Sequence, residues 1–403
     1  MKLTLMNRKV FSNYFGTILD KAVPLIISVL LVKYIAPEDY TKWSIYYSYL
    51  IVVHTFAFSP IFIKFAQEYN YKSKKANSEI SIFSGSLVLV LFTISSSFYY
   101  LYFGFDTRYF LLEILGFLFF PIYEYIAYID RFIENDIEYL KSSAIKFAIF
   151  IVCLIILFYL QKKINYNSIL LAFVLSYINI LFKRIRYISI SFNFCNSKEF
   201  LSISIYGLLS SFTASFDKYI MTFKNYSVED IATFSYIVTL IALPSVFIET
   251  IKKLYNPIIF KSFAGQNLTI EASEYKKEIK LYVSSAVLFQ LFVPFASFFS
   301  LYYIGLVNVS YLREGFFETF IVLNISTSIF IIYHFINQYY FYYSRTKSLI
   351  LFQIIAFVIS ILFLFYFGDD NSLFNIGIVK SVQLLAIFTI TFVAIRIYDR
   401  RNF

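Results

Sequence analysis

Long apolar segments alternate with short polar connections along the whole 403-residue chain. The apolar segments run for roughly 17–25 residues, the length that an α-helix needs to cross the hydrocarbon core of a bilayer. They lie near residues 11–32, 43–63, 81–103, 109–129, 144–160, 168–182, 200–223, 231–251, 281–304, 315–343, 348–367 and 376–395. The pattern therefore predicts an all-α integral membrane protein with about 12 transmembrane helices.

A short polar motif occurs once in each half of this pattern. Pro37–Ser44 and Val228–Ser235 share a Glu-Asp pair, an aromatic residue and a serine in the same register, and each leads into an apolar segment. Each copy follows a segment with an adjacent Asp-Lys pair, Asp20-Lys21 or Asp217-Lys218. Duplicated hydrophobic halves are typical of transporters built from repeats. We therefore expect two pseudo-repeated six-helix bundles, in residues 1–190 and 191–403.

The basic residues divide unequally between the two sets of connections. The set that includes the N-terminus holds 25 lysines and arginines, with Lys146 at the start of the fifth span counted there, and the opposite set holds 7. The positive-inside rule then predicts a multi-pass protein with both termini in the cytoplasm. The longest connection, residues 252–280, lies on the basic side, and its charged stretch Glu271–Lys280 is expected to form an amphipathic helix on the membrane surface.

The composition excludes several classes of function. The chain is 59% hydrophobic and 15% charged, too apolar for a soluble domain. The net charge of +10 follows from the basic connections, so we expect no nucleic-acid partner. Cys153 and Cys195 form no metal or redox motif, and no phosphate-binding loop or Gly-x-Ser-x-Gly motif is present. We expect no metal site, cofactor or ATP hydrolysis, with H⁺ or Na⁺ as the candidate coupling ion.

Lysines within the spans are the best candidates for substrate binding. Lys21 and Lys218 each lie on a polar stripe along one face of a predicted helix, the first formed with Tyr14, Thr17, Pro24 and Ser28 and the second with Ser204, Ser211, Ser215 and Thr222. Ionisable groups in a membrane usually face a cavity or a partner. Lys21, Lys218 and Lys380 are therefore predicted to bind an anionic substrate; the alternatives are an ion pair with aspartate or snorkelling to the interface.

A second group of residues is predicted to couple transport to an ion. The candidates are Asp20, Asp217, Glu124, His54 and His334. Each has a structural alternative. The aspartates would neutralise a neighbouring lysine, Glu124 would cap its helix or pair with Arg131, and the histidines would form helix–helix hydrogen bonds. Glu113 shares the fourth predicted span with Glu124.

Several motifs together resemble the polysaccharide and O-antigen flippases (Wzx type) of the multidrug/oligosaccharidyl-lipid/polysaccharide exporter superfamily. They are Asn13-Tyr14 with Lys21 and Pro24, Lys33–Tyr40 with Ser44, Asp217–Met221, Tyr255-Asn256-Pro257 and Asn308–Leu312. In place of Ala36 the family often has glycine. The resemblance covers essentially the whole chain and implies two six-helix bundles facing a central cavity.

What the resemblance implies is transport, not catalysis. The substrate would be an oligosaccharide on undecaprenyl pyrophosphate, moved by alternating access across the bacterial inner membrane for O-antigen, lipopolysaccharide or capsule synthesis. The expected partners are membrane lipids, a polysaccharide polymerase and a chain-length regulator, and Lys21 and Lys218 would engage the pyrophosphate or acidic sugars. The alternatives are an ion-coupled multidrug/cation antiporter of the same superfamily and an O-antigen polymerase. The polymerase is disfavoured because the connections on the outer side are short.

Overall fold

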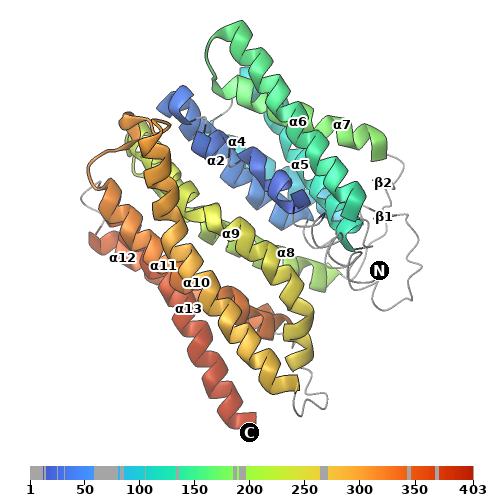
Figure 1. The fold of residues 1–403 in the computed structure, drawn as a ribbon, viewed down its shortest axis with the longest axis vertical. Helices are drawn as coiled ribbons and strands as arrows, with labels where there is room; N and C mark the ends of the chain where they lie inside the picture. Colours follow the sequence, from blue (N-terminus) through green and yellow to red (C-terminus); the bar gives the residue numbers. More distant parts are fainter. Residues whose placement is uncertain are drawn as a thin grey trace. The chain divides into compact units, whose positions relative to one another are not determined.

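The computed structural model describes residues 12, 15–24, 26–30, 32–58, 80–81, 86–104, 106–132, 136–184, 188–189, 197–263, 271–342, 346–367 and 372–402. Nearly all of these residues are helical, as Figure 1 shows. The exceptions with regular structure are two-residue strands, β1 (Ile80–Ser81) and β2 (Ile188–Ser189), which pair in parallel. The described chain is therefore all-α, as the hydrophobic pattern predicts.

The helices form two compact units. Unit 1 comprises residues 1–27 and 34–212, and unit 2 comprises residues 28–33 and 213–403. The change from one unit to the other falls inside a helix, α8 (Ser197–Phe223). The predicted boundary after residue 190 lies before this helix, and it stays a prediction.

Unit 1 is built from the first half of the chain. Its elements are a helical segment at residues 15–24, then α2 (Pro37–Val53), η3 (His54–Phe58), α4 (Ser86–Phe103), α5 (Thr107–Phe132), α6 (Asp136–Gln161) and α7 (Tyr166–Arg184). Between the first segment and α2 come η1 (Ile26–Leu30) and η2 (Val32–Tyr34), in which residues 28–33 belong to unit 2. Helix α7 packs along both α5 and α6, while α2 contacts α4, α5 and α7. Both η1 and η3 are π-helical, so the first two predicted spans are irregular where an ordinary α-helix was expected.

Unit 2 repeats this plan with longer helices. Its elements are the second part of α8, α9 (Val228–Phe263), α10 (Glu271–Tyr303), η5 (Val309–Tyr311), α11 (Phe316–Tyr342), α12 (Thr346–Phe367) and α13 (Leu373–Asn402). Helix α11 lies against α9, α10 and α13, and α12 packs on α13. Each predicted span coincides with a helical segment. The charged stretch Glu271–Lys280 is helical, as expected, and is the first part of the continuous helix α10; its place on the membrane surface stays a prediction.

Seven helices in the described part of the chain are long and apolar enough to cross a membrane. Three of them, α6, α10 and α12, are buried over only 22% of their most apolar window, so most of their apolar side chains face outward. Ile155, Tyr159 and Leu160 of α6 are examples. Such a continuous exposed apolar surface needs a lipid solvent. The chain is therefore a multi-pass membrane protein.

The interior of unit 1 is largely aromatic. The Trp43 ring of α2 stacks on Tyr47 with centroids 5.4 Å apart and meets Phe173 of α7 edge-on at 5.3 Å. Tyr46 stacks on Phe117 of α5 at 5.0 Å. Aromatic pairs of this kind add to the stabilisation from burial. The aromatic packing fixes α2, α5 and α7 as one framework, and the polar groups described below are held in it.

Candidate functional site

The first buried polar centre lies in unit 1 and joins the first helical segment to α6. Lys146 of α6 forms a salt bridge with Asp20, and its ammonium also donates to the Asp20 carbonyl oxygen at 3.0 Å. The Lys146 and Asp20 side chains are 0% and 1% exposed. A buried charge is tolerated only when it is paired and hydrogen-bonded, so each of these residues depends on the other.

Tyrosine side chains enclose this ion pair. The Lys146 ammonium lies 4.2 Å from the ring centroid of Tyr123 and 5.0 Å from that of Tyr177. The Tyr139 hydroxyl donates to Asp20 at 3.4 Å. Cation–π contacts strengthen when the cation is desolvated. Tyr123 and Tyr177 therefore stabilise the positive charge of Lys146 inside an apolar unit.

The second buried polar centre lies in unit 2 and joins α8 to α13. The Lys380 ammonium lies 2.8 Å from Asp217 Oδ1 and donates to the carbonyl oxygens of Thr213 at 2.6 Å and Ala214 at 2.9 Å. An ammonium has three donors, and here all three are engaged. Lys380, predicted to bind substrate, holds Asp217 and the α8 backbone in this arrangement.

Lys218 adds a second positive charge to this centre. Its side chain is buried in α8, and the charged groups that act on its ammonium are Asp217 and Lys380. Asp217 pairs with Lys380 and lies next to Lys218 in the sequence. We call Asp217, Lys218 and Lys380 the unit-2 triad. All three residues of the triad are buried.

The two centres have aspartates at equivalent positions of the repeat, but their lysines come from different helices. Asp20 and Asp217 occupy equivalent positions in the two copies of the repeat, whereas Lys146 comes from the fifth helix of its unit and Lys380 from the sixth. Lys146 is not among the predicted site residues, because it lies only two residues inside the predicted fifth span and counts with the basic connection. A lysine inside a predicted span is the feature of the sequence that could have identified it. The lysines that pair with Asp20 and Asp217 come from helices that are distant in the sequence.

Two other predicted residues of unit 1, Lys21 and Glu124, lie near Tyr47 together with Asp20. The charges of Asp20, Lys21 and Glu124 all act on the Tyr47 hydroxyl, so the structure brings these groups to one neighbourhood. Lys21 and Glu124 are partly buried.

The two histidines differ in how far the structure describes them. His54 is the first residue of η3, and its ring meets Phe120 edge-on with centroids 5.4 Å apart. The charge of Lys21 acts on His54, which places it near the Asp20 region. The His334 side chain, the Arg131 side chain and residues 13–14 lie outside the described part of the chain. Within the described residues, no group of three or more His, Cys, Asp or Glu side chains could hold a metal.

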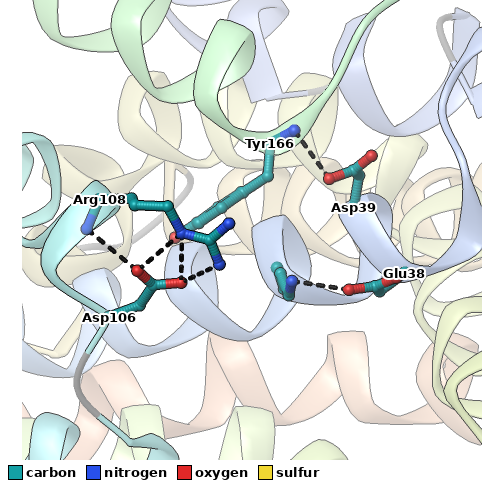
Figure 2. Close-up of polar contacts among 6 residues, drawn as sticks. Glu38, Asp39, Asp106, Arg108 and Tyr166 are labelled. Carbon is teal, nitrogen blue, oxygen red and sulfur yellow. Dashed lines mark hydrogen bonds and ion pairs between the residues drawn. The ribbon is translucent and has the colours of Figure 1, made fainter.

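The repeated Glu-Asp motif at the start of α2 contacts the start of α7 at one end of unit 1. Asp39 accepts a hydrogen bond from the backbone N–H of Tyr166 at 3.0 Å and so caps the first turn of α7 (Figure 2). Glu38 pairs with Lys42 at 2.7 Å. An unsatisfied N–H at a helix start gains from a carboxylate acceptor. The motif therefore links α2 to α7 and is structural in this unit.

The second copy of the motif forms ion pairs in unit 2. Asp230 of α9 lies 3.2 Å from the guanidinium of Arg313, and Glu229 lies 3.6 Å from it. Ser227 caps α9 by accepting from the Asp230 N–H at 3.1 Å. The motif ties the start of α9 to the connection between α10 and α11. Both copies lie at helix starts, where Asp39 caps α7 and Asp230 pairs with Arg313.

Exposed charges at this end of unit 1 stay ionised in mild acid. The Arg108 guanidinium hydrogen-bonds Asp106 at 2.6 Å (Figure 2), and this contact lowers the pKa of Asp106 from 3.8 to about 2. The hydrogen bond from Lys42 likewise lowers the pKa of Glu38. These pairs keep fixed charges near neutral pH, so they are unsuited to sensing physiological pH changes.

Comparison with known proteins places the fold. No family model and no curated protein matches the chain. A crystal structure of MATE in complex with MaL6 is 13% identical with a TM-score of 0.58, and the match covers 98% of this chain and 97% of that one. The lipid II flippase MurJ in an inward closed conformation is 16% identical with a TM-score of 0.54, covering 96% and 87%.

A third solved structure agrees. It is an outward-facing multidrug resistance MATE family transporter of the MOP superfamily, 12% identical with a TM-score of 0.50, covering 97% of this chain and 94% of that one. At these identities the likeness establishes the fold alone. The chain has the fold shared by MATE transporters and MurJ.

Proposed function

We propose that this protein is a flippase that moves undecaprenyl-pyrophosphate-linked oligosaccharide units from the cytoplasmic to the outer leaflet by alternating access. The observation that carries the proposal is the unit-2 triad, a buried group in α8 and α13 in which Lys380 pairs with Asp217 and Lys218 lies beside Asp217 in the sequence. A buried lysine within a membrane-spanning segment is a candidate partner for an anionic ligand. The fold it shares with a lipid II flippase supports a transport role rather than catalysis.

Within the triad the two lysines have different tasks. Lys380 has its three donors engaged with Asp217 and two α8 carbonyls, so it positions the aspartate. Lys218 supplies the charge that a pyrophosphate would balance, because a lysine is a compact point-charge partner for phosphate. In unit 1 Lys21 is the equivalent lysine and is proposed to assist at the sugar end.

The cation antiporter is less well supported by these centres. Such a protein needs a carboxylate to attract its substrate, and both repeat-related aspartates already have a lysine partner, Lys146 for Asp20 and Lys380 for Asp217. Each aspartate is therefore already neutralised. The polymerase alternative requires a large loop for catalysis; the connection between α4 and α5 has three residues and that between α6 and α7 has four.

Several further properties belong to this proposal. The protein would lie in the bacterial inner membrane with both termini in the cytoplasm, in contact with membrane lipids, a polysaccharide polymerase and a chain-length regulator. Coupling would use H⁺ or Na⁺, with Asp20, Asp217, Glu124, His54 and His334 as the residues predicted for it. The sugar would serve O-antigen or capsule synthesis.

Deletion of the gene in its host tests the proposal. A flippase predicts loss of surface polymer together with intact single units trapped on the cytoplasmic face, measured by polysaccharide gels and a sidedness assay for lipid-linked sugar. Surface molecules that carry one repeat unit would indicate a polymerase instead. An unchanged polysaccharide, together with increased sensitivity to lipophilic cations, would support the antiporter and reject the flippase.

A further inference from the structure

Glu113 is a buried carboxylate that the two lysine centres do not use. It lies in α5, six residues after Thr107 at the start of that helix, about 9 Å along the axis at 1.5 Å per residue. The residue is 6% exposed. A carboxylate at this depth in an apolar unit needs either a counter-ion, hydrogen-bond donors or a proton.

Tyrosine hydroxyls surround Glu113 from three helices. Tyr166 of α7 donates to Glu113 Oε1 at 2.6 Å and Tyr99 of α4 donates to the same oxygen at 3.4 Å. Tyr46 of α2 donates to the Glu113 carbonyl oxygen at 3.0 Å. We call Glu113 with Tyr46, Tyr99 and Tyr166 the tyrosine cage. Its Oε1 contacts are all hydroxyls.

Among the described residues, the charged and titratable groups that face Glu113 are tyrosines and an aspartate. They are Tyr46, Tyr99, Tyr100 and Tyr166 from the neighbouring helices and Asp106 from the preceding connection. Among the described residues neither lysine nor arginine pairs with this carboxylate, in contrast to Asp20 and Asp217. Hydroxyl donors stabilise the ionised form, but a hydroxyl also accepts a hydrogen bond from the protonated form. The cage can therefore hold the carboxyl in either state.

The cage also lies near an end of its unit. Tyr166 is the first residue of α7, and its backbone N–H donates a hydrogen bond to Asp39 of the repeated Glu-Asp motif. Asp106 precedes α5 at the same end. Glu113 therefore lies within about two helical turns of this end of its unit.

We propose that Glu113 is a proton-binding site, at which one carboxyl oxygen takes up and releases H⁺ while Tyr166 and Tyr99 rotate between donating and accepting. No covalent bond between heavy atoms forms or breaks. Proton binding at Glu113 is independent of the solute that the protein carries. Its use in coupling transport rests on the proposed function.

Infrared difference spectroscopy of the purified full-length protein in lipid tests proton binding without a transport assay. Spectra are compared between acidic and basic samples over roughly pH 5–9, the range in which buried glutamates titrate. The expected result is a protonated-carboxyl C=O band that disappears in Glu113→Gln. The matched control is Glu138→Gln, since Glu138 is an exposed residue of α6 paired with Lys141; it should leave the band intact.

A second variant guards against a general folding defect in Glu113→Gln. Tyr166→Phe removes the 2.6 Å donor and should move the pH midpoint of the band, whereas Tyr159→Phe on the exposed face of α6 should not. A band that is unchanged in Glu113→Gln would overturn the proposal. A band lost on adding Na⁺ at constant pH would also overturn it, because the cage would then bind a metal cation in place of a proton. A normal band together with failed flipping would reject only the proposed function.

Discussion

Asp217 and Lys380 lie 2.8 Å apart in unit 2, and the same aspartate position of the first repeat, Asp20, pairs with Lys146. The repeat therefore conserves a buried carboxylate on the first helix of each unit, while its lysine comes from a different later helix. Each pair ties the first helix to a later helix of its own unit, α6 in unit 1 and α13 in unit 2.

The buried pair of unit 2 is predicted to be essential for stability. Asp217→Asn leaves Lys380 without its carboxylate, and loss of one partner of a buried pair costs about 3–5 kcal/mol. The free energy of unfolding in mixed micelles measures this cost. Lys380→Met should be similarly destabilising, and Asp217→Asn with Lys380→Met together should cost less than the sum of the two. Additive costs would mean that the pair contributes little.

The cap on α7 is predicted to matter modestly. Asp39→Ala removes the acceptor of the Tyr166 N–H, and loss of a capping side chain costs about 1 kcal/mol. Asp39→Asn keeps an oxygen acceptor and should cost less. Melting temperatures in detergent compare the two variants. Equal losses for both would show that the charge, not the hydrogen bond, is what stabilises the turn.

Substitution of Gly116 tests the packing between α2 and α5. A Cβ at this position would lie 2.0 Å from the Tyr46 hydroxyl and 3.2 Å from its ring carbon Cζ, and the ring is buried against Phe117. Gly116→Ala should therefore destabilise by about 1–3 kcal/mol, the usual cost of overpacking. It should also lose the Tyr46–Glu113 hydrogen bond. Unaltered stability would mean that the Tyr46 ring shifts freely.

The stabilisation from Asp106–Arg108 should disappear only in strong acid. A depressed carboxyl pKa contributes stability above the unfolded value of 3.8, and this contribution is lost as the pH falls through the folded value of about 2. The difference in melting temperature between the protein and Asp106→Asn should therefore be constant above about pH 5 and shrink toward pH 2. Arg108→Gln should give the same profile. A difference that changes near neutral pH would contradict this.

Much of the architecture follows from the sequence. The apolar segments predict the all-α membrane fold. The repeated motif and the charged residues within apolar segments point to Asp20 and Asp217, because carboxylates are rare inside membrane spans. The tertiary pairings did not follow. Lys146 and Lys380 reach their aspartates from helices far apart in sequence, and a polar stripe along one helix does not reveal which distant helix faces it. The Glu113 cage likewise requires four helices to be placed together.

The central claim is that Lys218 supplies charge for an anionic lipid-linked substrate. The most direct measurement is flipping of a lipid-linked oligosaccharide by the full-length protein in proteoliposomes, comparing the wild type with Lys218→Gln and, as a matched control, Lys224→Gln just beyond α8. A lost charged hydrogen bond costs about 1.5–3 kcal/mol, so Lys218→Gln should lower the flipping rate roughly 10-fold to 100-fold at unchanged melting temperature. Unchanged flipping by Lys218→Gln at normal protein levels would contradict the account.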